Sequence, residues 1–136
     1  MLRKLKYYFV FFIIFLLSST CIRDNIKIDL KSNDWEIVKI RKQGEFLYST
    51  TVISYIVKFI DNDNYTIKLD VNNCIGNYNI GSKGKIEIIS PACTKICCDS
   101  DFAIELMNLL PKMSNYYISG NELFLEGIGE IVLRKK

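Results

Sequence analysis

The sequence predicts a single domain of the α+β class that is mainly β. From residue 34 onward, short runs rich in Ile, Val, Tyr and Phe alternate with turn-forming residues. Only the segment 99–110 changes to the three- and four-residue spacing of an amphipathic helix. The chain has 136 residues, which is the usual length of about one domain.

The first strand is expected over 34–42, where the apolar residues do not alternate strictly. Trp35 and Ile37 would share one face of a regular strand, and Val38 and Ile40 would share the other. A strand that is covered on both faces has this pattern. We therefore expect packing against both of its faces.

A β-hairpin is expected next, on either side of the turn formers Asp61–Asn64. Apolar side chains take alternate positions in 53–60 and again in 65–71, which is typical of half-buried strands. These positions are Ile53, Tyr55, Val57 and Phe59 in the first strand and Tyr65, Ile67, Leu69 and Val71 in the second. One face of the hairpin should therefore be buried.

The remaining elements are predicted from one change in the spacing of apolar residues and from glycine-containing turns. We expect a helix over 99–110 that is capped by Asp99 or Ser100 and stopped by Pro111. Its apolar face holds Phe102, Ala103, Leu106, Met107 and Leu110. Further strands are expected at 77–80, 85–89, 115–119, 122–126 and 130–134.

Composition and charge exclude several classes of function. The chain has no histidine, which removes Ser-His-Asp and Cys-His catalysis and histidine-ligated metal sites. Its formal charge is +3, and Arg3, Lys4 and Lys6 account for the excess. The rest of the chain is neutral, whereas a nucleic-acid binder needs a basic surface. We therefore expect no nucleic acid among its partners.

The N-terminal segment has the three parts of a secretory signal peptide. Met1–Lys6 is basic, Tyr7–Leu17 is apolar and Ser18–Thr20 consists of small residues. The apolar run has 11 residues, so as a helix it spans about 16 Å. That is short for a hydrocarbon core of about 30 Å, which favours a signal peptide over a membrane span.

Cys21 directly follows these small residues, in an arrangement that resembles a bacterial lipobox. In that motif the cysteine becomes the N-terminus and carries acyl chains such as palmitate, which anchor the protein to a membrane. We expect a signal peptide over 1–20, a lipid anchor and polar tether over 21–33, and a folded domain over 34–136. The alternative is ordinary cleavage that leaves Cys21 as an unmodified thiol.

Four cysteines remain when Cys21 is set aside: Cys74, Cys93, Cys97 and Cys98. An even number in an exported domain predicts two disulfides. Adjacent cysteines are not expected to bond with each other, so Cys74 would pair with Cys97 or with Cys98. The spacing lacks the paired CxxC hooks of a zinc site. A redox-active thiol at Cys97 or Cys98 is a further alternative, because a helix N-terminus stabilises a thiolate.

Five acidic residues are candidates for a catalytic pair or a calcium site: Asp61, Asp63, Asp99, Asp101 and Glu105. Asp61 and Asp63 have the spacing that opens a calcium loop, but its glycine and closing glutamate are missing. Turn formation and helix capping explain the same residues. We therefore expect no enzymatic activity, no metal and no cofactor.

A series of short motifs follows in one order along the chain. They are Trp35, Tyr65-Thr66-Ile67, Cys74 with Gly76 and Tyr78, Thr94–Cys98, Tyr117-Ile118 and Leu123-Phe124-Leu125. In this order they resemble the META/HslJ-like domain, a small exported domain of bacterial envelope lipoproteins. Ile75 departs from the family pattern, which has asparagine after its first cysteine.

The resemblance implies a fold, a disulfide pattern and no characteristic set of catalytic residues. The fold is a curved antiparallel sheet, a partial barrel of about seven strands, packed around one helix. The resemblance aligns Cys74 and Cys98 with the family's common cysteine pair, which favours Cys74–Cys98 and Cys93–Cys97 disulfides. The family has no characteristic set of catalytic residues.

Three functional hypotheses follow. The first is a non-enzymatic envelope lipoprotein, at the outer membrane or facing the periplasm, that binds a small apolar ligand or acts under stress. The second is an inhibitor or partner of an envelope enzyme, which it would contact through Arg41–Thr50 and Asn72–Asn77, because rigid loops lose little entropy on binding. The third is a thiol-redox protein that uses Cys97 and Cys98.

The lipid anchor can be tested by the substitution Cys21→Ser. C21S should move the exported protein from the membrane fraction to the soluble fraction, because serine cannot carry the thioether-linked lipid. Cell fractionation and immunoblotting measure this, with Ser19→Ala as the matched control. A C21S protein that still sediments with membranes would show that the anchor prediction is wrong.

Overall fold

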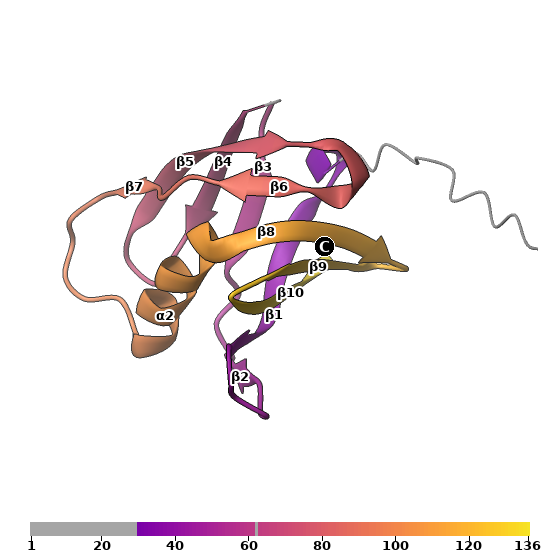
Figure 1. Cartoon of the computed structure of the whole chain (residues 1–136). Coiled ribbons are helices and arrows are strands. Elements are labelled where there is room, and N and C mark those ends of the chain that lie inside the picture. The colour runs from indigo at the N-terminus through magenta and orange to yellow at the C-terminus, as the bar shows by residue number, and fades with distance from the viewer. Residues whose placement is uncertain (1–29, 62) are drawn as a thin grey trace, which may run out of the picture.

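A computed structural model describes residues 30–61 and 63–136 (Figure 1). In this part of the chain, ten strands form one antiparallel sheet with the order β6-β5-β4-β3-β1-β10-β9-β8, while β2 pairs with β1 and β7 with β5. The elements are η2 (Leu30–Ser32), β1 (Asp34–Lys42), β2 (Ser49–Thr50), β3 (Ile56–Phe59), β4 (Asn64–Lys68), β5 (Asn73–Ile80), η3 (Ser82–Gly84), β6 (Ile86–Ile88), β7 (Ala92–Cys93), α2 (Asp101–Leu109), η4 (Leu110–Lys112), β8 (Met113–Ser119), β9 (Glu122–Gly127) and β10 (Gly129–Lys135).

The two ends of this strand order, β6 and β8, lie side by side, so the sheet is nearly closed into a barrel. An isolated bridge joins Lys85 to Asn115 across the seam. Gly84 has a φ of +73°, and a Cβ there would lie 2.7 Å from the carbonyl oxygen of Tyr116. Glycine therefore permits the close approach of η3 to β8.

The predicted fold class is confirmed in the described residues: mainly β, with a curved antiparallel sheet and one α-helix. The sheet has ten strands rather than about seven, partly because β2 and β7 are two residues long and show no recognisable period. The helix α2 covers one end of the barrel. Its Glu105 pairs with Lys42 at the end of β1, and its Phe102 stacks on Tyr55 just before β3.

The irregular pattern of β1 comes from a β-bulge. Ile37 pairs with Leu133 and Lys39 with Val132, so Val38 is the extra residue of the bulge. The bulge shifts the strand by one position, and Trp35, Ile37 and Ile40 are therefore all buried. The expectation of a strand with two covered faces was wrong, because a local bulge produces the same sequence pattern.

The predicted hairpin of β3 and β4 is confirmed, with Val57 opposite Ile67 and Phe59 opposite Tyr65. Both strands are shorter than expected, because Ile53 and Val71 are exposed and lie outside them. The helix begins at Asp101, and the Ser100 hydroxyl caps it by accepting a hydrogen bond from the Ala103 amide. Of the two predicted caps, Ser100 is therefore the one used.

The core extends further toward the N-terminus than the predicted domain start at residue 34. Leu30 is buried, and the Trp35 indole Nε1 donates a hydrogen bond of 2.9 Å to its carbonyl oxygen. Residues 30–33, which we assigned to the tether, therefore belong to the packed domain. Aromatic side chains fill the concave side of the sheet: Trp35, Tyr55, Phe59, Tyr65 and Tyr78.

The role of Trp35 can be tested by the substitution Trp35→Phe. The change leaves the Leu30 carbonyl without its donor and opens a void, so the free energy of unfolding should fall by about 2–3 kcal/mol. Chemical denaturation followed by circular dichroism measures this. Tyr117→Phe, which removes only a hydroxyl from a side chain that is 42% exposed, should change stability by less than about 0.5 kcal/mol. Equal stability of the two variants would contradict the role given to Trp35.

Candidate functional site

The four cysteines of the described domain form pairs that differ from those expected. Cys74 on β5 lies directly opposite Cys93 on β7, and their sulfurs form a disulfide of 2.02 Å. The sulfurs of Cys97 and Cys98 pair with each other. The expected Cys74–Cys98 and Cys93–Cys97 pairings were wrong, because the short strand β7 brings Cys93 to Cys74.

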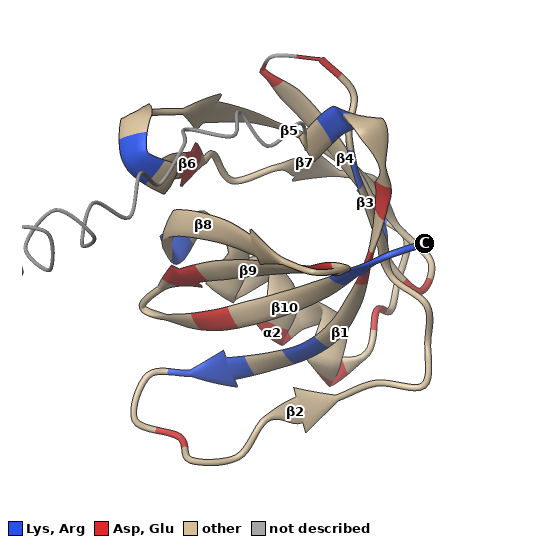
Figure 2. Ribbon diagram, turned by 90° about the vertical axis from the view of Figure 1, so that its right-hand side faces the viewer, with Lys and Arg blue, Asp and Glu red and all other residues tan. Residues whose placement is uncertain are grey.

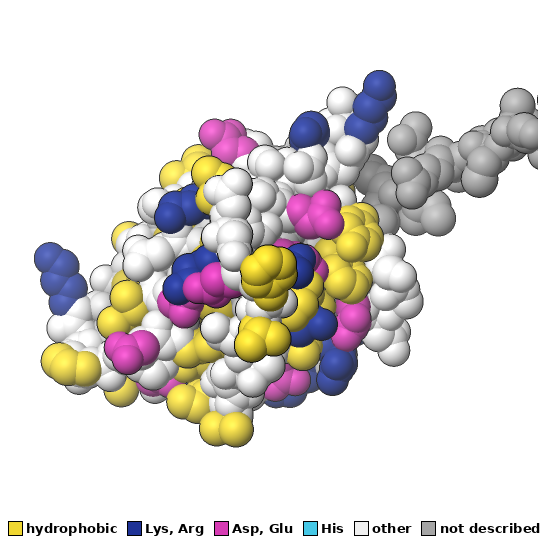
Figure 3. All heavy atoms as spheres, turned by 60° about the horizontal axis from the view of Figure 1, so that its bottom comes forward, with side chains coloured by type: hydrophobic (Ala, Val, Ile, Leu, Met, Phe, Trp, Pro, Cys, Tyr) yellow, Lys and Arg dark blue, Asp and Glu magenta, His cyan; other side chains and the backbone are white. Residues whose placement is uncertain are grey.

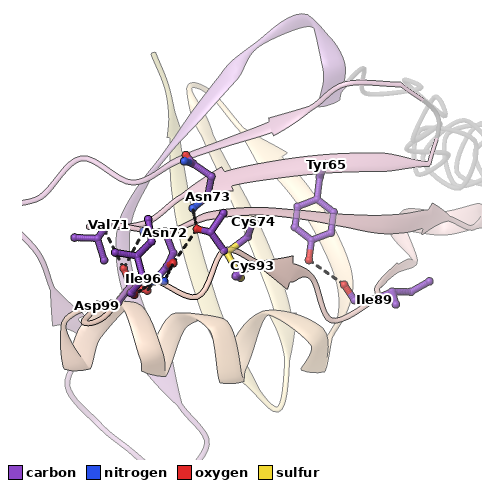
Figure 4. Close-up of a disulfide and its surroundings, with 10 residues drawn as sticks. Tyr65, Val71, Asn72, Asn73, Cys74, Ile89, Cys93, Ile96 and Asp99 are labelled. Carbon is purple, nitrogen blue, oxygen red and sulfur yellow. Dashed lines mark hydrogen bonds between the residues drawn. A yellow bond between two sulfur atoms is a disulfide. The ribbon is translucent and has the colours of Figure 1, made fainter.

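The segment between β7 and α2, which carries Cys97 and Cys98, is held by the side chain of Asn72 (Figure 4). Its Oδ1 accepts hydrogen bonds from the Ile96 amide at 2.9 Å and from the Thr94 hydroxyl at 2.8 Å. Its Nδ2 donates to the Ile96 carbonyl at 2.7 Å and to Asp99 at 2.5 Å. Asn72 is buried, and all its polar capacity serves this segment.

A second polar contact fixes the start of α2 to the end of β4. Asp70 accepts hydrogen bonds from the Ser100 amide and from the Tyr55 hydroxyl, both at 2.7 Å. Burial raises the pKa of Tyr55. Together with Asn72, these contacts make the cysteine-bearing segment part of the scaffold, although Cys97 and Cys98 themselves are exposed.

The acidic candidates lie in separate places and have local partners. Asp61 accepts hydrogen bonds from the Asn64 side chain and from the Asp63 and Asn64 amides, which lower its pKa to about 2. Asp99 binds Asn72, and Glu105 pairs with Lys42 at 2.8 Å. In 30–61 and 63–136, no three Cys, Asp or Glu side chains gather in a way that could hold a metal ion.

Of the two predicted contact loops, one is a strand and one is a projecting loop. Asn73–Ile80 is β5, so the expected loop over Asn72–Asn77 was wrong. The chain after Lys42 does leave the barrel and returns as β2 at the edge of the sheet (Figure 2). The β2 end of the molecule displays apolar side chains among charged ones (Figure 3).

The apolar side chains on both sides of β2 are exposed to an unusual degree. Phe46 and Leu47 are 95% and 83% exposed, Val52 is fully exposed and Ile53 is 44% exposed. We call these four residues the apolar tip. Monomeric domains seldom leave adjacent large apolar side chains in water without a binding function, so the apolar tip is the candidate functional site.

The loop is fixed at its base by Tyr48, next to the apolar tip. The Tyr48 hydroxyl donates to Glu130 at 2.8 Å, and Glu130 also pairs with Arg41 at 2.6 Å. The Tyr48 ring lies 4.2 Å from Lys39 Nζ and 4.6 Å from the Arg41 guanidinium carbon. Burial and the Glu130 carboxylate raise the pKa of Tyr48.

The signal peptide over 1–20 and the acylation site Cys21 lie outside the described residues. Among the described residues, no helix is long and apolar enough to cross a membrane. The signal peptide and the acylation of Cys21 therefore remain predictions.

The fold defines a small, nearly closed antiparallel β-barrel with a helix over one end. No family model and no curated protein matches the chain. The crystal structure of a DUF4847 family protein from Bacteroides vulgatus ATCC 8482 is similar, with a TM-score of 0.59 and 12% sequence identity. The match covers 78% of this chain and 94% of that chain. At this identity the similarity shows the fold alone.

The anchoring role of Asn72 can be tested by Asn72→Ala. The variant removes the side-chain partner of the Ile96 amide and of Asp99 Oδ2, so the free energy of unfolding should fall by about 2–3 kcal/mol. The Ile96 amide should also exchange its hydrogen faster. Asn79→Ala, which removes an exposed bond to Glu87, should cost less than about 0.5 kcal/mol. Unchanged exchange at Ile96 in N72A would contradict the role given to Asn72.

Proposed function

We propose that this protein is a non-enzymatic binding module of the META/HslJ type, exported and held at the cell envelope by a lipid on Cys21. It contacts a protein partner through the apolar tip. The exposure of Phe46, Leu47 and Val52 carries the proposal. The Cys74–Cys93 disulfide supports export, because disulfides persist in oxidising compartments.

The geometry of the loop is suited to binding a protein. Large apolar side chains near the centre of an interface supply most of its binding energy. Tyr48 fixes the base of the loop on the sheet through Glu130, so less conformational entropy is lost when the apolar tip is covered. Residues 46–53 carry no charge, so the apolar tip itself adds no charged group that must be desolvated.

A thiol-redox role is the second candidate, favoured by the exposure of the adjacent Cys97 and Cys98 next to the N-terminus of α2. In this role the two thiols would lose two electrons and two protons to a disulfide-bonded protein and form a bond between them. The Cys97→Ser and Cys98→Ser variants would then trap a mixed disulfide with that protein. The absence of such a mixed disulfide from non-reducing gels would contradict this role.

The binding proposal can be tested with a photo-crosslinking phenylalanine analogue at position 46 of the full chain in intact cells. Irradiation should give a protein adduct, because Phe46 would lie in the interface. The analogue at Ile75, which is also exposed, is the matched control and should give none.

Loss of the neighbouring apolar side chains should weaken the same contact. With the analogue at Val52, the double substitution Phe46→Ser and Leu47→Ser should reduce the adduct by at least about tenfold. No protein adduct from position 46 or 52, or equal adducts from position 75, would contradict the proposed function.

A further inference from the structure

We infer that the partner of the apolar tip is a second copy of this chain. Two copies pair edge to edge along β2, in antiparallel orientation, about a two-fold axis at Ser49 or Thr50. This inference rests on the proposed function and names the partner of the same site.

The first argument is the open edge of β2. One edge pairs with β1, with Thr50 opposite Lys39 and Ser49 opposite Ile40. The other edge has no strand beside it in the described part of the chain. Successive strand residues direct their N–H and C=O groups to opposite edges, so one of Ser49 and Thr50 offers these groups to a new strand.

The second argument is the absence of the features that normally prevent edge pairing. Natural edge strands carry lysine, proline or a bulge that blocks a second strand. Residues 46–53 read Phe-Leu-Tyr-Ser-Thr-Thr-Val-Ile, with no charge, no glycine and no proline. Most of these residue types favour strands, so the segment is suited to pairing on both edges.

The third argument is the two-fold pattern of the segment, in which an apolar pair lies on each side of Tyr48–Thr51. Residues directly opposite each other in antiparallel strands must point the same way, so a two-fold axis passes between a residue and its own copy. Only Ser49 and Thr50 are in the strand, and the chain bends at 46–47 and at 52–53. An axis at Ser49 or Thr50 places the Phe46-Leu47 pair of one copy on the same side of the axis as the Val52-Ile53 pair of the other.

In both registers each end of the paired β2 strands carries four apolar side chains, two from each copy. A segment that complements itself about a two-fold axis favours a closed, isologous dimer. A membrane surface is less well matched to the apolar tip, because the neighbouring cations already have partners within the protein. Lys42 pairs with Glu45 and Glu105, Arg41 pairs with Glu130, and Lys39 lies over the Tyr48 ring.

The contact area predicts a weak dimer that forms on the membrane. Eight apolar side chains and the paired backbones bury on the order of 1,000 Å², at the low end of specific interfaces. Two chains anchored in one membrane meet at a far higher effective concentration than in dilute solution. The dimer should therefore be tested in the intact envelope with the full chain.

The test uses single cysteine substitutions, because a residue on the two-fold axis meets its own copy. Under mild oxidation, either Ser49→Cys or Thr50→Cys should give a disulfide-linked dimer, and peptide mapping should show the new cysteine bonded to itself. Ile75→Cys is the exposed control and should give none. Adding Phe46→Ser and Val52→Ser, which change only exposed side chains, should reduce the dimer at least tenfold.

The alternative results separate this inference from the proposed function. If neither cysteine variant dimerises while position 46 still crosslinks to a different protein, the partner is not a second copy of this chain, and the proposed binding module stands. If position 46 gives no protein adduct of any kind, both are wrong. Binding of the unacylated C21S chain to phosphatidylglycerol vesicles, lost in Phe46→Ser, without cysteine dimers would assign the apolar tip to the membrane and overturn the inference. Cysteine-linked species larger than a dimer would overturn the two-fold pairing.

Discussion

Pairing along both edges of β1 joins the barrel into one structure. One edge of β1 pairs with β10 along almost its whole length, and the other pairs with β3 only over Asp34–Glu36. The strand therefore connects the sheet of β3 to β6 with the sheet of β8 to β10. The bulge at Val38 keeps Ile37 and Ile40 on the core side within this long strand.

The same pairing explains where the apolar tip lies. Because β3 covers only the first part of its edge, the second part of β1 is paired by Ser49 and Thr50 of β2. The chain must cross from the end of β1 to the start of β3 through this short strand, which leaves 46–53 at the margin of the sheet. The hydrogen bond from Tyr48 to Glu130 fixes this connecting segment to the sheet. The short pairing of β3 with β1 therefore explains both why the apolar tip is exposed and why its base is fixed.

Two connections of the barrel have opposite roles. The segment after β7 is held to the scaffold through Asn72 and Asp99, with its hydrogen bonds directed inward. The segment between β1 and β3 directs apolar side chains outward. The similarity to the DUF4847 structure supports the barrel without indicating an activity.

The sequence by itself determined the mainly β class, the β3–β4 hairpin, the helix near 99–110 and the presence of paired cysteines. These features depend on local periods, turn residues and composition, which can be read along the chain. The tertiary structure decided the Val38 bulge, the Cys74–Cys93 pairing and the exposure of Phe46. Each depends on which distant strand lies alongside, because a bulge, a cross-strand disulfide and an open edge are properties of a strand pair and not of one segment.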